Sequence, residues 1–157
     1  MKTTYPLRSL FAILLPLTLL LSSCGDDDKK DDPKPATTHQ VVVRYNGQNI
    51  NGLGAAVSAG SVSPSGTATS YFSDNLATTT NISEQKPQPF TIPAGDDFSV
   101  TVSFTNVRGT QRAPAGATLY AAILVDGQVR KTVTIDNTTA PGNAYVTASA
   151  KILASEW

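Results

Sequence analysis

The sequence is short of the residues that most often carry out chemistry in proteins. Its 157 residues include one cysteine, Cys24, and one histidine, His39. A lone cysteine cannot form an internal disulfide, and a lone histidine cannot complete the usual ligand set of a closed zinc site. A Ser-His-Asp triad would have to recruit His39, and the sequence has no Gly-x-Ser-x-Gly nucleophile elbow. We therefore expect no catalytic residues, no metal site and no cofactor.

Acidic residues are also few after residue 35, where the sequence has only seven. A glycosidase needs two carboxylates facing each other across a cleft. Asp96 and Asp97 are adjacent, so on an extended chain they would point to opposite faces. We expect Gly95-Asp96-Asp97 to form a turn, and no Asp-x-Asp-x-Asp-Gly calcium loop is present. The sequence thus predicts a protein that is not an enzyme.

No excess of charge of either sign is present. The chain has 12 basic and 12 acidic residues, and beyond Pro35 it has seven of each. Proteins that bind nucleic acid need clustered Lys and Arg to displace the counterions of the phosphates. A neutral domain has no such cluster, so the composition argues against nucleic acid as a partner.

The longest apolar run is too short to cross a membrane. Residues 10–21 (LFAILLPLTLLL) form a largely apolar run of 12 residues, preceded by Lys2 and Arg8. A spanning helix needs about 20 residues, whereas a run of this length after a basic start is typical of a signal peptide. The run ends in Leu21-Ser22-Ser23-Cys24, which resembles the lipobox of bacterial lipoproteins. That resemblance implies that residues 1–23 are removed and that Cys24 receives a diacylglycerol and an amide-linked acyl chain such as palmitate.

Residues 24–37 after this motif predict a flexible tether. Residues 25–35 read GDDDKKDDPKP and contain only charged residues, Gly and Pro, which cannot bury apolar surface. An acidic cluster behind a lipidated cysteine resembles the surface-export signal of Bacteroidota lipoproteins. Gly25, where enterobacterial inner-membrane retention signals have Asp, favours the outer membrane. The sequence leaves open whether the protein faces the periplasm or the cell surface.

Residues 38–157 show the two-residue period of β-strands. Residues 98–104 alternate apolar and hydroxyl side chains, and residues 119–125 are apolar on both faces, as in a central strand. Asp126-Gly127 then predicts a tight hairpin turn into residues 129–135, with Val129 on the same face as Val133 and Ile135. In the same way, we expect Asn46-Gly47 to close a first strand over residues 40–45.

The other predicted strands are weaker. They cover residues 53–61, 67–72, an edge strand that ends at Ile92, and 144–153. No stretch has helical spacing over three turns. We predict an all-β domain, an antiparallel Ig-like β-sandwich of seven or eight strands over residues 38–157. A small closed barrel is the alternative.

One further resemblance rests on the order of short segments. Tyr71-Phe72, Pro89-Phe90-Thr91-Ile92-Pro93 and Ile123-Leu124-Val125-Asp126-Gly127-Gln128-Val129 follow one another as in small β-sandwich envelope proteins. The layout resembles that of the mycobacterial MmpS transport accessory proteins, which carry a transmembrane helix instead of a lipid. This resemblance covers residues 70–152 and implies a β-sandwich with a role in envelope transport.

Candidate binding residues lie on and beside the longest predicted loop. Arg108 and Arg112 fall in residues 105–117, which have no apolar period, and Tyr120 follows closely. Long loops in compact domains are often functional. We therefore expect a lipid-anchored envelope protein that binds a protein or glycan partner there. The alternative is a structural or accessory subunit of an envelope transport or assembly complex. A binding module should expose apolar residues among its end loops, and a subunit along a sheet face or edge.

Overall fold

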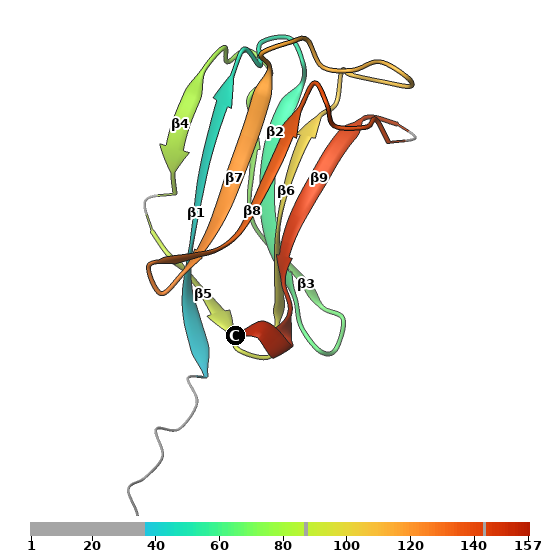
Figure 1. Ribbon diagram of the computed structural model, residues 1–157. Helices are drawn as coiled ribbons and strands as arrows, with labels where there is room; N and C mark the ends of the chain where they lie inside the picture. The colour runs from blue at the N-terminus through green and yellow to red at the C-terminus, as the bar shows by residue number, and fades with distance from the viewer. Residues whose placement is uncertain (1–36, 87, 143) are drawn as a thin grey trace, which may run out of the picture. The chain divides into compact units, whose positions relative to one another are not determined.

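The computed structural model describes residues 37–86, 88–142 and 144–157. The predicted signal peptide, the lipidation site Cys24 and residues 24–36 of the predicted tether lie outside the described residues. The described part is an antiparallel β-sandwich (Figure 1), as predicted, and not a closed barrel. Its elements are β1 (Thr38–Gln48), β2 (Ala55–Val62), β3 (Ala68–Asn75), β4 (Ile82–Gln85), β5 (Phe90–Pro93), β6 (Asp97–Phe104), β7 (Thr118–Val125), β8 (Gln128–Asp136), β9 (Val146–Ile152) and a single 3₁₀ turn, η1 (Ala154–Glu156).

The two sheets divide the strands five and four. The first sheet has the order β4-β1-β7-β8, with β5 also paired to β1, and the second has the order β3-β2-β6-β9. The strands β4 and β5 lie one after the other along the same side of β1. They are separated by a segment that contains Pro87 and Pro89, and proline cannot donate to a β-ladder. The predicted edge strand is therefore two short strands, which raises the strand count in the described residues to nine.

The core lies between the sheets and is built by the inward residues of β1, β2, β6 and β7. Phe98, Val100, Val102 and Phe104 alternate with half-buried hydroxyl residues and are fully buried, as the two-residue period predicts. The ring of Tyr71 in β3 packs at a tilt against Phe90 of β5 with ring centroids 5.0 Å apart, and this contact links the edges of the two sheets. The aromatic residues thus close one side of the sandwich.

The Asp126-Gly127 hairpin is confirmed, but the pairing of the following strand, β8, with β7 is irregular. Asp126 and Gly127 have φ angles of 50° and 84°, which a tight turn between antiparallel strands requires. The pairing of β7 with β8 shifts at Ile123 and Leu124. This bulge turns Val129 to the outer face opposite Leu124, where it is 56% exposed. The prediction that Val129 shares a face with Val133 and Ile135 is therefore wrong.

The predicted Asn46-Gly47 turn is also wrong. Both residues lie inside β1, which continues to Gln48 and pairs with β7 on one side and β4 on the other. Gly47 faces inward beneath Ile50, and a Cβ there would lie 2.7 Å from the Ile50 Cδ1. The glycine serves close packing rather than a turn, and the chain leaves the strand at Asn49, which has a φ of 53°.

The start of β1 is fixed by the C-terminal residues. The His39 side chain is only 13% exposed and stacks on Trp157 with ring centroids 4.9 Å apart. The Trp157 indole Nε1 donates a hydrogen bond of 2.7 Å to the Asp96 carbonyl oxygen. Glu156 accepts a 2.6 Å hydrogen bond from the Lys131 Nζ. Residues 153–157 therefore hold together strands from both sheets (Figure 1).

Four carboxylates at the ends of the sandwich have pKa values below their usual range. Hydrogen bonds from Lys151 and the Ala154 N–H lower the pKa of Asp97, and a hydrogen bond from His39 lowers that of Asp126. The pKa of Asp136 is lowered by hydrogen bonds from Thr138 and Thr139, and that of Glu156 by the Leu153 N–H and by Lys131. A lowered pKa means that the charged form is favoured more strongly in the folded state than in the unfolded state.

We predict that the melting temperature of the full-length protein falls as the pH is lowered. The carboxylates contribute stability above their unfolded-state pKa values, 3.8 for Asp and 4.5 for Glu, and this contribution is lost as the pH falls through the lower folded-state values. The loss should therefore begin near pH 4.5 and continue below it. Differential scanning calorimetry between pH 7 and pH 2 measures it. Asp97→Asn should flatten the slope, and a wild-type melting temperature that does not change over this range would contradict the assignment.

Candidate functional site

The predicted binding residues are on two different surfaces. Arg108 and Arg112 lie in the loop between β6 and β7, where the Arg108 Nε donates to the Thr105 carbonyl. The Arg112 Nη1 donates a 2.9 Å hydrogen bond to the Thr138 carbonyl and so ties this loop to the β8–β9 loop. Tyr120 lies in β7 on the outer face of the first sheet. The structure therefore separates Tyr120 from the two arginines and uses Arg112 to fix a loop.

The long loop itself is packed onto the end of the sandwich. Val107 and Ala113 are buried and belong to the core, and Asn106 donates through Nδ2 to the Gly52 carbonyl. The loop that the sequence singled out is thus mainly a structural cap, and the more promising surface is around Tyr120.

That surface is the outer face of the first sheet, where outward side chains of three neighbouring strands are mostly uncharged hydrogen-bonding groups. The register places Arg44 opposite Gln85, and Asn46 between Ser83 of β4 and Tyr120 of β7. We call this surface the amide face and define it by Arg44, Asn46, Gln48, Ser83, Gln85 and Tyr120.

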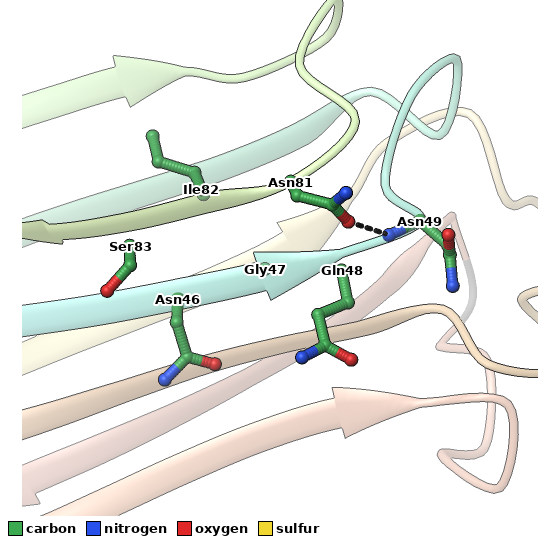
Figure 2. A pocket seen from close by; sticks show the side chains of 7 residues that line it. All are labelled: Asn46, Gly47, Gln48, Asn49, Asn81, Ile82 and Ser83. Carbon is green, nitrogen blue, oxygen red and sulfur yellow. Dashed lines mark hydrogen bonds between the residues drawn. The ribbon is translucent and has the colours of Figure 1, made fainter.

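Two adjoining depressions lie on the amide face. The first has a volume of about 700 Å³ and is lined by β1, β4 and the loop residues Asn49 and Asn81. Figure 2 shows the side chains of Asn46, Gln48 and Ser83 on the same side of the strands, while Ile82 points to the other side. The second, of about 470 Å³, shares Asn46 and Ser83 with the first and extends to Tyr120, Ala122 and Val129. Each depression lies within the size range of ligand pockets, and together they form one extended surface.

The upper rim of the first depression is held by hydrogen bonds between loops. The Asn81 Oδ1 accepts a 3.1 Å hydrogen bond from the Asn49 N–H, which Figure 2 marks with a dashed line. The Asn49 Nδ2 donates a 3.0 Å hydrogen bond to the Gly116 carbonyl. The rim is therefore built by the β1–β2, β3–β4 and β6–β7 loops, which meet at the same end of the sandwich (Figure 1).

The amide face has polar groups to offer to a ligand. Within the described residues, the side chains of Asn46, Gln48, Ser83 and Tyr120 make no hydrogen bond to another residue. By contrast, the Arg44 Nε donates to the Gln85 Oε1, and this contact fixes the guanidinium beside an amide. The face thus combines positioned groups with groups that are free to bind.

A charged cluster on the inner side of β4 fixes the strand that carries Ser83 and Gln85. The Lys86 Nζ forms ion pairs with Asp74 of β3 and with Glu84 of β4. It also lies 4.7 Å from the centroid of the Phe72 ring. Burial opposes the protonated form, but the hydrogen bonds to Asp74 and Glu84 raise the pKa of Lys86 overall. Burial and the hydrogen bond to Asp74 likewise raise the pKa of the Tyr45 hydroxyl. The cluster joins the two sheets beneath the amide face.

Exposed large apolar side chains are not gathered in one place. They are Val62 at the end of β2, Val129 in β8, Tyr145 before β9 and Leu153 after it. Single exposed apolar residues are ordinary on protein surfaces. The distribution therefore matches neither pattern expected for a binding module or a structural subunit, and the polar amide face remains the better-defined site.

Two further findings concern the described part of the chain only. Residues 37–157, without positions 87 and 143, contain no group of three or more His, Cys, Asp or Glu side chains that could hold a metal ion. The same residues include no helix long and apolar enough to span a bilayer.

The sequence contained a signal for the amide face that the Asn46-Gly47 motif hid. In β1 the polar residues Arg44, Asn46 and Gln48 point outward and alternate with the buried residues Val43, Tyr45 and Gly47. Ser83 and Gln85 repeat the pattern on β4, but four residues are too few to show a period. Comparison with known proteins identified no matching family model, no similar curated protein and no similar solved structure.

Proposed function

We propose that this protein is a lipid-anchored, non-enzymatic binding protein of the bacterial cell envelope. Its amide face is the site for a partner, a protein or a glycan. The observation that carries the proposal is the pair of adjoining depressions, which share Asn46 and Ser83 and are lined by amide, hydroxyl and aromatic side chains. A few well-placed polar groups around a concave surface are the usual features of a binding site.

The anchor in this proposal is the lipid on Cys24. The apolar run, the Leu21-Ser22-Ser23-Cys24 motif and the acidic residues that follow support attachment to the outer membrane. Two or more acyl chains are needed for stable attachment, because each buried CH₂ contributes about 0.8 kcal/mol. The tether then leaves the sandwich free to meet a partner in the envelope or at the cell surface.

The use of the acidic residues supports a non-enzymatic role. Asp74, Asp97 and Glu156 form ion pairs with lysines, and Asp126 binds His39. Asp136 accepts hydrogen bonds from the backbone and hydroxyl groups of its own turn. These carboxylates hold the fold together, and none of them faces another across a depression of the amide face.

The proposal predicts that removing two outward amides weakens binding strongly. Immobilised full-length protein should retain specific components of an outer-membrane extract, and Asn46→Ala combined with Gln48→Ala should reduce that retention by roughly tenfold. Two lost hydrogen bonds of about 0.5–1.5 kcal/mol each produce a change of this order. The bound fraction is measured by quantitative mass spectrometry and glycan analysis.

The matched control changes two outward residues of the other sheet. Ser99→Ala combined with Ser103→Ala alters β6, and Ser99 lines a smaller depression of about 300 Å³. This control protein should retain the extract as well as the wild type does. Equal retention by all three proteins, or loss in the Ser99 and Ser103 variant alone, would contradict the assignment of the site.

A further inference from the structure

We infer that the amide face binds a neutral, linear glycan. This inference rests on the proposed function and specifies the class of partner. It is drawn from the chemistry, the shape and the charge of the face.

The polar groups of the face match the hydroxyl groups of a sugar. A sugar hydroxyl both donates and accepts hydrogen bonds, and Asn and Gln side chains offer an acceptor oxygen beside two N–H donors. Asn46 and Gln48 supply two such groups on one strand, and Ser83 adds a hydroxyl on the next. The Arg44 guanidinium, held by Gln85, adds planar N–H donors that can meet two neighbouring hydroxyls at once.

The apolar groups of the face match the other side of a sugar ring. A pyranose presents C–H groups on its flat faces, and an aromatic ring with a polar tip can cover them while the tip stays hydrated. Tyr120 is half-buried at the side of the second depression, next to Ala122 and Val129. The depression therefore has an apolar wall on the β7–β8 side and polar groups on the β1–β4 side.

The shape of the face fits a chain rather than a single sugar. Residues 44, 46 and 48 follow one another along β1 and span about 13 Å, since a strand rises about 3.3 Å per residue. The three strands β4, β1 and β7 lie about 4.8 Å apart, so the face is about 10 Å wide. The two depressions lie end to end along β1 because both contain Asn46 and Ser83. A linear oligosaccharide laid along β1 would contact both.

The charge of the face favours a neutral ligand. The second depression is lined by one cation, Arg44, and one carboxylate, Glu84, which also pairs with Lys86, so the lining carries no excess charge. An anionic polymer would need several cations, which the described part of this face does not supply. A protein partner would be expected to use a large apolar patch at its centre, whereas the amide face has polar groups there.

The test is isothermal titration of the full-length lipoprotein in detergent with individual pentasaccharides. The neutral probes are cellopentaose, maltopentaose, mannopentaose and xylopentaose, and the anionic probe is pentagalacturonate. We expect at least one neutral probe to bind and the anionic probe to bind more weakly. Affinity for the neutral probe should change by less than about twofold between low and high salt, because no ion pair is formed with it.

Two substitutions of Tyr120 separate the ring from the hydroxyl. Tyr120→Ala should weaken binding of the neutral probe by roughly tenfold or more, since the stacking surface is lost. Tyr120→Phe keeps the ring and should stay within about threefold of the wild type. The Asn46→Ala and Gln48→Ala protein gives the same test without changing an aromatic residue, and circular dichroism checks that each variant is folded.

The outcomes distinguish this inference from the proposed function. Failure of all four neutral probes to bind, or tighter binding of pentagalacturonate, would overturn the glycan inference. If envelope proteins were still retained through Asn46 and Gln48, the proposed function would stand with a protein as the partner. If no glycan bound and the retention of envelope material were unchanged by the Asn46→Ala and Gln48→Ala substitutions, both the glycan inference and the proposed function would be overturned.

Discussion

Replacing Cys24 by alanine is expected to move the protein from the membrane pellet to the soluble fraction. The lipid would supply the attachment, since a diacylglycerol and an acyl chain bury many CH₂ groups at about 0.8 kcal/mol each. The sequence beyond Pro35 is neutral, and residues 25–35 of the tether have five Asp against three Lys, so neither part is attracted to anionic lipids. The loss should be almost complete after an alkaline wash, as measured by immunoblotting of the pellet and supernatant.

The control for this prediction is Gly25→Ala, which leaves Cys24 in place. That variant should stay in the membrane fraction and should incorporate a labelled palmitate analogue, whereas Cys24→Ala should not. N-terminal sequencing establishes whether the leader has been removed from each protein. A Cys24→Ala protein that has lost its leader and still resists the wash would contradict lipid anchoring at this residue.

Removing residues 154–157 is expected to destabilise the sandwich strongly. The truncation deletes the Trp157 ring that stacks on His39, the indole hydrogen bond to Asp96 and the Glu156 carboxylate bound by Lys131. The Arg130 Nη2 also loses its 2.6 Å hydrogen bond to the Glu156 carbonyl. Loss of a partly buried aromatic residue together with its hydrogen bonds should lower the free energy of unfolding by about 2–4 kcal/mol. We expect the melting temperature to fall by about 10 °C.

A smaller change in Trp157 separates the stacking from the hydrogen bond. Trp157→Phe retains an aromatic ring next to His39 but has no indole N–H, so it should lose about 1 kcal/mol, the net contribution of one hydrogen bond. Both variants are compared with the wild type by calorimetry and by urea unfolding at pH 7. A truncated protein that melts at the wild-type temperature would show that residues 154–157 do not hold the sheets together.

Much of the fold could be predicted from the sequence because its clearest signals are local. The alternation of apolar and hydroxyl residues over 98–104 predicts a strand with one buried face, and the structure has β6 there. The Asp126-Gly127 turn depends on two positive φ angles that these residues tolerate. The apolar run over residues 119–125 marked β7, which lies between β1 and β8. In each case the residues themselves determine the local structure.

The errors occurred where partners distant in sequence determine the structure. Asn46-Gly47 is a sequence typical of tight turns. In the structure Gly47 instead lies within β1, where Ile50 and Leu119 pack over it and β4 pairs with it. The two-residue period would place Val129 on the inner face with Val133 and Ile135, but the bulge near Leu124 turns it outward. Trp157 had no interpretation in the sequence, because its contacts are with His39 and Asp96, more than 60 residues away. Such contacts cannot be found from period and turn signals alone.

The candidate site, too, could be predicted only as far as local sequence signals reach. Tyr120 was singled out from the sequence, and the structure places it on the amide face. Arg108 and Arg112 were grouped with it because they precede it along the chain, but their loop is fixed to the end of the sandwich. The partners of Tyr120 come instead from β1 and β4, which reach it only through strand pairing. A sequence alone does not specify that register.

The most direct test of the central claim is the ratio of outer-membrane material retained by two variants. One is the Asn46→Ala and Gln48→Ala protein, and the other is the Ser99→Ala and Ser103→Ala protein, each full-length and lipidated. A partner held on the amide face predicts a ratio of roughly one tenth, with both proteins folded. A ratio near one, with both retaining as much as the wild type, would contradict the assignment of this face as the binding site.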